Sequence, residues 1–318
     1  MRAVGRPGLR VSLMSPTSNL QPPVVVTGAC GFIGRYVVQH LADYPGPVVL
    51  VDRVLPTYAL PSQMIFHRTE LAEPTALVPP DMEVDAGFVL VHLAWDMRRG
   101  PTYAGQMAHV QWLAALLDYW GERGLKRFIG LGSAEEYGAR SGVLYEWDPP
   151  IYPLSPYGLG KYTAWSLARS WGARAGRDVL WLRPFIAYGP GQRGSMVLPY
   201  ALEQLRAGAE ATFSDGLQER DFVHVDDVAR AIRSAVETTV TGVHAVNLGT
   251  GQSVAVRDVL QYLAGQMNAA HLIRLGVRPR RHGEPARQTA SVNVAEDVLG
   301  WRARIAWQDG VRRLVGEN

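Results

Sequence analysis

The feature that most constrains this chain is the stretch Val24–Gly34, which reads VVVTGACGFIG. Three valines lead into glycines at positions 28, 31 and 34, and an apolar pattern of helical period follows. This order predicts a buried parallel strand, a tight glycine turn and a helix. Glycines in such a turn let a pyrophosphate approach the helix N-terminus, where free N–H groups and the helix dipole favour anions. Gly28, Gly31 and Gly34 therefore predict a dinucleotide site.

A second apolar run, residues 48–51, ends in the acidic residue Asp52. A carboxylate at the end of this strand accepts hydrogen bonds from both ribose hydroxyls and repels a 2′-phosphate. Asp52 therefore favours NAD over its phosphorylated form. The neighbouring Arg53 opposes this preference, because its guanidinium could hold a 2′-phosphate.

Strand and helix patterns alternate along the first part of the chain and predict an α/β fold, a doubly wound parallel sheet of the Rossmann type. Further strands are expected at residues 64–67, 87–94, 127–131 and 179–182, and helices at 106–119 and 155–175. We interpret residues 23–190 as the NAD-binding domain, to which residues 220–240 return. Residues 191–318 are expected to form mainly a smaller α/β substrate-binding lobe over the carboxyl edge of the sheet. Residues 1–22 form a peripheral tail, in which Met1 or Met14 is the true start.

Composition narrows the class of protein. Hydrophobic residues make up 47% of the 318 residues and charged residues 19%, as in soluble globular proteins. The net charge is +3 and the basic residues are scattered, so no nucleic-acid partner is expected. No apolar run reaches membrane-spanning length, and no metal site is expected. The single cysteine, Cys30, excludes an internal disulfide and fits a reducing cytoplasm.

Tyr157 and Lys161 stand four residues apart on a predicted helix, so both project from one face. An ammonium beside a phenol favours the phenolate and lowers its pKa, and a tyrosinate can take a proton from an alcohol as hydride leaves the carbon. Only two lysines occur in the chain, which makes a lysine at this position notable. Ser133, at the end of a predicted strand, can hydrogen-bond the reacting oxygen.

The sequence resembles the extended short-chain dehydrogenase/reductases, in particular the nucleotide-sugar epimerase/dehydratase group. The resemblance extends from Val24 to Gly316 and is carried by several motifs besides the glycine turn: His92-Leu93-Ala94, GSAEEYG at 132–138, SPYGLGK at 155–161, LRPF at 182–185, YGPGQ at 188–192, RDFVHVDD at 220–227 and NLGTG at 247–251.

The resemblance implies an NAD-dependent enzyme acting on the C4 hydroxyl or ketone of a nucleoside-diphosphate sugar. Ser133, Tyr157 and Lys161 would carry the redox step. Phe32, Ile33, Leu93 and Ala94 would join Asp52, Arg53 and the glycines in cofactor binding. Arg220 and Arg287 would hold the substrate diphosphate through charge-assisted contacts.

Departures from the family pattern leave the reaction open. Ala134 replaces an acid found in dehydratases, whereas Glu135 remains at the position where dehydratases carry a glutamate that acts at C5. Adjacent Glu135 and Glu136 look most like reductases of 4-keto-6-deoxy sugars. Ile186 replaces an asparagine that commonly contacts substrate. The alternatives are therefore a net NAD(P)H-dependent ketoreductase and, from another class, an NAD-sensing protein without turnover.

Assembly is predicted from two helices, 106–120 and 157–175, whose apolar residues occupy more than one face. These residues are Trp112, Leu116 and Tyr119 on the first helix, and Trp165, Leu167 and Trp171 on the second. The family resemblance implies that such helices pair across a two-fold axis, so we expect a homodimer.

Overall fold

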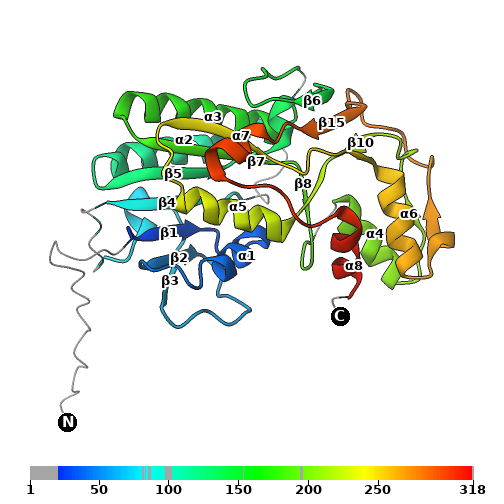
Figure 1. Ribbon diagram of the computed structural model, residues 1–318, viewed down its shortest axis with the longest axis horizontal. Helices are drawn as coiled ribbons and strands as arrows, with labels where there is room; N and C mark the ends of the chain where they lie inside the picture. The colour runs from blue at the N-terminus through cyan, green and yellow to red at the C-terminus, as the bar shows by residue number, and fades with distance from the viewer. Residues whose placement is uncertain are drawn as a thin grey trace, which may run out of the picture.

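The computed structural model describes residues 21–80, 82, 84, 87–96, 102–152, 154–193 and 196–316. Its centre is a parallel seven-stranded sheet with the order β12-β7-β5-β4-β1-β2-β3 (Figure 1). The strands are β1 Val24–Thr27, β2 Val48–Asp52, β3 Met64–Arg68, β4 Phe88–His92, β5 Leu125–Leu131, β7 Asp178–Pro184 and β12 Val243–Leu248. The predicted doubly wound α/β fold is confirmed. Most of the tail predicted for residues 1–22, with the Met1 or Met14 question, lies outside the described residues.

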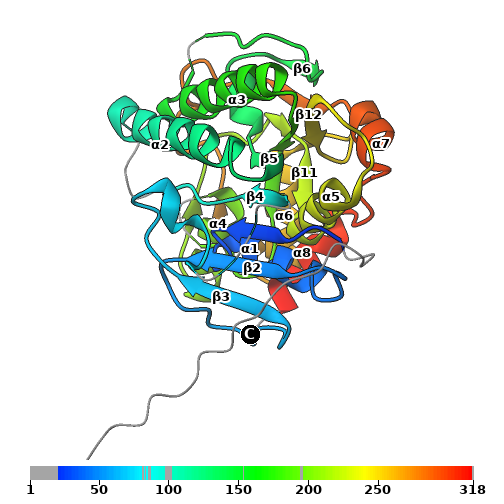
Figure 2. The same cartoon turned by 90° about the vertical axis from the view of Figure 1, so that its left-hand side faces the viewer.

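Helices cover both faces of this sheet (Figure 2). One face carries α1 (Phe32–His40), α5 (Val225–Glu237) and α7 (Asn293–Leu299), and the other carries α2 (Tyr103–Gly121) and α3 (Pro156–Ala175). Successive valines of β1 enter different cores: Val24 and Val26 pack with α1 and α5, whereas Val25 packs with α2. Because strand side chains alternate between faces, a strand buried on both sides needs an uninterrupted apolar run.

The helix predicted for residues 155–175 begins and ends where its sequence signals lie. The Ser155 side chain caps it by accepting from the Gly158 N–H, and Pro156 occupies the first turn. At the other end Gly176 adopts φ 60°, a left-handed conformation that glycine accepts readily. Since α3 carries Tyr157 and Lys161, these local signals fix where the two side chains leave the helix.

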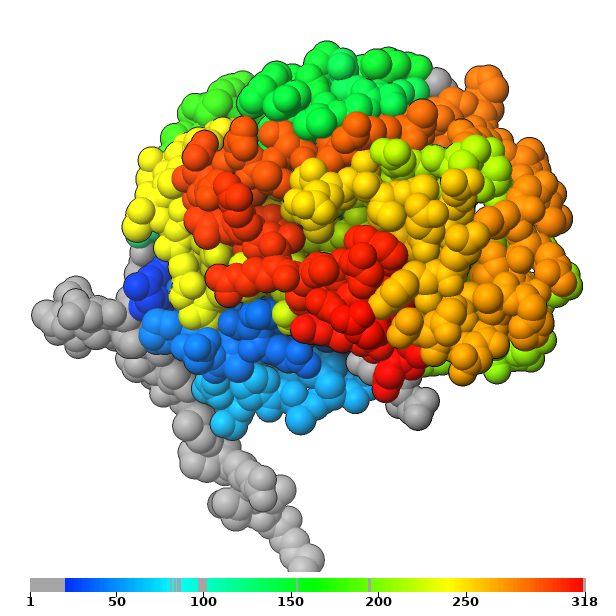
Figure 3. All heavy atoms as spheres, turned by 45° about the vertical axis from the view of Figure 1, so that its right-hand side comes forward, coloured from blue at the N-terminus to red at the C-terminus, as the bar shows by residue number. Residues whose placement is uncertain are grey.

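The remaining elements form a smaller lobe (Figure 3). They are β6 Gly142–Leu144, β8 Ile186–Tyr188, α4 Val197–Arg206, β9 Ala211–Thr212, β10 Glu219–Arg220, β11 Phe222–His224, β13 Val254–Ala255, α6 Val256–Gln266, β14 Ile273–Arg274, β15 Arg287–Ala290 and α8 Trp307–Gly316. Helices α4, α6 and α8 supply most of its apolar core. A four-stranded sheet, β13-β10-β15-β6, takes its last strand from the first half of the chain.

The chain crosses between the lobes more than once. After β11, helix α5 packs against α1, and β12 then pairs with β7 at the edge of the large sheet. The sequence analysis does not predict β12, because His244 and Asn247 interrupt its apolar pattern. The register aligns Asn247 with Arg183 of β7, so polar residues of both strands meet at the carboxyl edge.

Candidate active site

The glycine turn is held by close backbone packing. Gly28 has φ 72°, and a Cβ on it would lie 2.8 Å from the backbone nitrogen of Ala94. A Cβ on Gly34 would lie 2.1 Å from the Gly28 carbonyl oxygen. A side chain at either position would force the backbone apart, so β1, α1 and the Leu93–Ala94 segment can meet only through glycine. This cradle fits a dinucleotide pyrophosphate at the start of α1, where Phe32 and Ile33 form the first turn.

Asp52 lies directly beside this turn. Its Oδ2 accepts from the Cys30 N–H at 2.9 Å, and its Oδ1 accepts from the Val54 N–H at 3.1 Å. The structure thus brings the strand-end carboxylate and the glycine turn together. Arg53 is engaged elsewhere, because its guanidinium donates to the Asp96 carboxylate at 2.8 Å. This ion pair directs the Arg53 charge toward Asp96 and raises the pKa of the guanidinium.

Ser133, Tyr157 and Lys161 meet at the carboxyl end of β5. Lys161 is 4% exposed, and its ammonium donates to the Leu131 carbonyl at 2.7 Å, so it bridges α3 and the strand end. Ser133 is close enough to the Tyr157 phenol to lower its pKa. The Ser133 Oγ also accepts from the Glu135 N–H at 3.1 Å, as the cap of the short 3-10 helix Ala134–Tyr137.

The electrostatics of this trio differ from the expectation. Burial raises the pKa of Tyr157, and the charges of Glu135 and Glu136 raise it further, against the lowering effect of Ser133. Burial also lowers the pKa of Lys161 to about 7. The expected lowering of the tyrosine pKa is therefore wrong for the protein without ligands, because desolvation penalises the charged forms of both side chains and the glutamates add to the penalty for Tyr157.

Trp95 packs against the Lys161 ammonium. It was not among the site residues predicted from the sequence. The Lys161 Nζ lies 3.7 Å from the centre of the Trp95 ring, compared with 5.8 Å for the Tyr157 ring. The Trp95 indole donates to Gln106 at 2.9 Å, and a Cβ on Gly160 would lie 2.9 Å from the Gln106 Cβ. The signal available in the sequence was a tryptophan directly after the strand-end motif His92-Leu93-Ala94.

Glu135 lies at the rim of this region and is exposed. Its Oε2 accepts from the Ser155 hydroxyl at 2.5 Å, so it contacts the residue that caps α3. A Cβ on Gly158 would lie 2.5 Å from the Glu135 carbonyl oxygen, which shows how closely this loop approaches the helix. Glu135 is close enough to Tyr157 for its charge to raise the tyrosine pKa.

Arg220 of β10 is 8% exposed and forms an ion pair with Glu284 at 3.0 Å. Burial lowers its pKa, Glu284 opposes this, and the charges of Arg280 and Arg281 lower the pKa further. The charges of three guanidinium groups therefore act on one another here, although Arg280 is paired with Asp215 at 2.7 Å, and an anion would be a further partner for them. Arg280 and Arg281 were not among the predicted site residues, although they belong to the basic run RPRR at 278–281.

Arg287 lies on β15, opposite Glu219 of β10 in the strand register. Its side chain is 51% exposed, and its Nε lies 3.5 Å from the Glu219 carboxylate. Arg220 pairs with Gln288 in the same register, and successive strand side chains point to opposite faces, so Arg287 projects with Glu219 and away from Arg220. Its charge is compensated by Glu219. Ile186 lies on the neighbouring strand β8, where its N–H donates to the Asp221 carbonyl.

Metal-binding clusters and membrane-spanning helices are both absent from the part of the chain that the structure describes. No group of three or more His, Cys, Asp or Glu residues there could hold a metal ion. None of the helices described is both long and apolar enough to cross a membrane.

A doubly wound sheet with a glycine cradle, a strand-end aspartate and a Ser–Tyr–Lys trio defines the class of NAD-dependent short-chain dehydrogenase/reductase enzymes. The model of the NAD dependent epimerase/dehydratase family matches residues 24–249, and the chain belongs to this family. NAD is its cofactor, and would be held by the glycine cradle and Asp52. When bound, NAD accepts and returns hydride.

Three relatives illustrate the range of the family. The chain is 30% identical to MoeE5, whose structure holds UDP-glucuronic acid and NAD, with a TM-score of 0.78 over 92% of this chain and 97% of that one. It is 26% identical to the UDP-glucuronic acid 4-epimerase of Bacillus cereus, with a TM-score of 0.78 over 92% and 98%. It is also 27% identical to the GDP-6-deoxy-D-mannose reductase of Pseudomonas aeruginosa, over 92% of this chain and 95% of the relative.

Proposed function

We propose that this enzyme inverts the C4 centre of a UDP-hexose or UDP-hexuronic acid by transient oxidation and reduction. The observation that carries the proposal is the meeting of Tyr157, Ser133 and Lys161 beside the NAD cradle. The substrate class is supported by MoeE5, the relative that holds UDP-glucuronic acid with NAD at 30% identity. Asp52 adds support, because an enzyme that regenerates its own NAD has no need of the phosphorylated cofactor.

The roles of the residues follow from their atoms. The Tyr157 phenolate takes the proton of the C4 hydroxyl, and the Ser133 hydroxyl donates a hydrogen bond to the same oxygen. The Lys161 ammonium would stabilise the phenolate and, with NAD bound, would help to hold the nicotinamide end of the cofactor. The C4 hydride would leave to bound NAD in the first half of the reaction and return from it in the second. Once the 4-ketone has rotated within the site, Tyr157 would return its proton to the oxygen, and the hydride would enter from the other face of the ring.

We assign substrate binding mainly to residues 191–318, apart from the segment that returns to the large sheet. Arg220, with Arg280 and Arg281 near it, would hold the diphosphate, which replaces Glu284 as the partner of Arg220. Arg287 would assist from the neighbouring strand. This exchange of one anion for another keeps a buried guanidinium paired before and after binding.

The test is turnover with a panel of nucleotide sugars. Purified protein is incubated with UDP-glucose, UDP-glucuronic acid and UDP-N-acetylglucosamine, and C4 epimers are resolved by NMR. We expect one of these to reach an epimer equilibrium without added cofactor, with Tyr157→Phe as the inactive control. If none is converted, and a 4-keto sugar is reduced at the expense of NADH or NADPH instead, the epimerase proposal is wrong.

Glu135 supports dehydratase-type chemistry as a second candidate, since its exposed carboxylate lies beside the trio. Running the reaction in deuterated water separates the two. Deuterium at C5 that disappears in Glu135→Gln would establish proton removal at C5 and favour a dehydratase. Absence of deuterium from the wild-type product would leave Glu135 as the partner of Ser155 and favour the epimerase.

We also propose a homodimer formed through α2 and α3, as the family resemblance implies. The apolar side chains on which the expectation rested are buried or half-buried within one chain: Trp112, Leu116, Tyr119, Trp165, Leu167 and Trp171. The support therefore comes from the resemblance rather than from an exposed apolar face. Light scattering at micromolar concentration should give twice the chain mass of 34.9 kDa, and the single-chain mass would contradict the proposal.

A further inference from the structure

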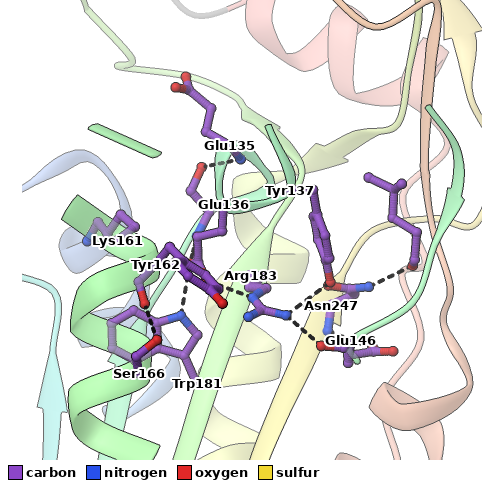
Figure 4. A network of polar contacts seen from close by, with 12 residues as sticks. Glu135, Glu136, Tyr137, Glu146, Lys161, Tyr162, Ser166, Trp181, Arg183 and Asn247 are labelled. Atoms are coloured by element: carbon purple, nitrogen blue, oxygen red, sulfur yellow. Dashed lines mark hydrogen bonds and ion pairs between the residues drawn. The ribbon is translucent and has the colours of Figure 1, made fainter. Parts of the chain in front are cut away.

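A second carboxylate lies beneath Ser133 and has no part in the proposed reaction. Glu136 is 1% exposed. Its Oε1 accepts two hydrogen bonds, from the Ser133 backbone N–H and from the Trp181 indole N–H, both at 2.9 Å. Its Oε2 accepts from the Arg183 Nε–H at 2.8 Å (Figure 4). Glu136 therefore fixes the backbone of Ser133 to β7, the strand that carries Trp181 and Arg183.

The local backbone is adapted to this carboxylate. A Cβ on Gly132 would lie 2.3 Å from the Glu136 Oε1 and 2.3 Å from the Trp181 Nε1. Any side chain at position 132 would therefore displace the carboxylate or the indole. Gly132, Glu136 and Trp181 form one unit, in which the glycine provides the room that the other two occupy.

Arg183 anchors the unit in the core. Its Nη1 donates to the Tyr137 hydroxyl at 3.1 Å and to the Glu146 carbonyl at 2.9 Å. The Tyr137 hydroxyl donates in turn to Asn247 of β12 at 2.7 Å (Figure 4). Apolar residues of similar volume often replace a buried ion pair without loss of stability, so stability alone does not explain this pair.

The charge of Glu136 also reaches the catalytic side chains. It raises the pKa of Lys161, in opposition to burial, and it raises the pKa of Tyr157. The other titratable groups near these two side chains are Glu135 from the same loop and His92 from β4. The pKa of His92 is lowered to about 3 by burial, so this ring is neutral and leaves Glu136 as the buried anion nearest the trio.

We propose that Glu136 is a positioning residue: its carboxylate holds the Ser133 backbone N–H and the Trp181 indole at the end of β5, and it is a buried negative charge that favours the ammonium form of Lys161. The inference deepens the proposed function, since it concerns the same trio. It assigns to the Gly132–Glu136–Trp181 unit a role in the geometry and charge of the site rather than in folding.

The two lysines of the chain make a direct test possible, because lysine labelled with 13C at Cε gives one NMR signal from Lys126 and one from Lys161. Lys126→Arg assigns the signals. Lys161 should titrate near the pKa of about 7 in the wild type. In Glu136→Gln its pKa should fall by about half a pH unit or more, because a neighbouring anion is lost.

Glu146→Gln is the matched control. Glu146 is also buried, at 8% exposed, and also belongs to the Arg183 surroundings, but its Oε1 accepts from the Asn247 N–H rather than from Ser133. This variant should leave the Lys161 titration unchanged and kcat within about twofold. Glu136→Gln should lower kcat about tenfold with little change in KM, because Ser133 acts on the reacting oxygen.

A double variant guards against loss of folding. Glu136→Val with Arg183→Met replaces the ion pair by apolar groups, and its thermal melting shows whether the core is retained. A folded double variant that shares the kcat loss and the lowered Lys161 pKa supports the proposal. The proposal is overturned if Glu136→Gln matches Glu146→Gln in either the titration or kcat. The titration needs no substrate, so it remains decisive even if the proposed reaction is wrong.

Discussion

The cofactor region is fixed by backbone contacts, whereas the arginine cluster of the smaller lobe is held by carboxylates. Gly28 and Gly34 meet neighbouring backbone with no room for a side chain, so the cradle exists before any ligand arrives. Arg220 instead pairs with Glu284, and a bound diphosphate would have to replace that acid. The cofactor region is therefore preorganised, while substrate binding requires an exchange of partners.

The largest effect is expected within the preorganised half. Tyr157→Phe should lower turnover by ~10²-fold or more, because the acid–base group is lost while the surrounding packing is kept. NAD binding, measured by calorimetry, should change little. A nearly normal rate in this variant would show that Tyr157 is not the acid–base group. The contrast between the two regions would then lose its support.

The arginine cluster should respond mainly in binding. Arg220→Met should weaken UDP binding ~30-fold, ~2 kcal/mol, because a buried charge-assisted contact is lost. Arg287→Met should weaken it less than about threefold, since its side chain is 51% exposed and near Glu219. Titration calorimetry with UDP measures both. Equal losses would show that Arg220 and Arg287 contribute alike and would contradict the assignment of the main diphosphate contact to Arg220.

The relative affinity for NAD(H) and its phosphorylated form tests whether Asp52 or Arg53 controls the choice of cofactor. Asp52 should give at least tenfold preference for NAD(H) over the phosphorylated form, ~1.4 kcal/mol. Arg53→Ala should leave that ratio within about twofold, because the guanidinium is bound to Asp96. Equal affinities for the two cofactors in the wild type would refute the assignment of Asp52.

The smallest expected effect is the pH dependence of NAD binding. The pKa of Lys161 is about 7 in the protein without ligands, and the negative pyrophosphate should raise it on binding. NAD binding then takes up a proton above pH 7, so affinity should fall about fivefold from pH 7 to pH 8. Lys161→Met should abolish this dependence. Calorimetry in buffers of different ionisation enthalpy measures the uptake directly, and its absence in the wild type would contradict the lowered pKa.

The sequence by its local pattern determined those features that depend on residues close together in the chain. The glycine turn, the apolar strands buried on both faces and the helix from Ser155 to Gly176 are each specified by neighbouring residues. Strand-end positions then followed from parallel topology, which places Ser133, Asp52 and the Leu93–Ala94 segment at one edge. The family motifs also lie within these segments, which is why the class of enzyme was readable.

Only the tertiary structure decided which partner each charged side chain contacts. Three such contacts join residues far apart in the sequence, and no spacing rule predicts them: Arg53 with Asp96, Lys161 with Trp95 and Arg220 with Glu284. The four-residue spacing of Tyr157 and Lys161 predicted that they project from one face of the helix, but it did not predict how deeply they are buried. That burial raises the pKa of Tyr157, opposite to the expected direction. Desolvation depends on every element packed around a group, so it is fixed only when the whole chain has folded.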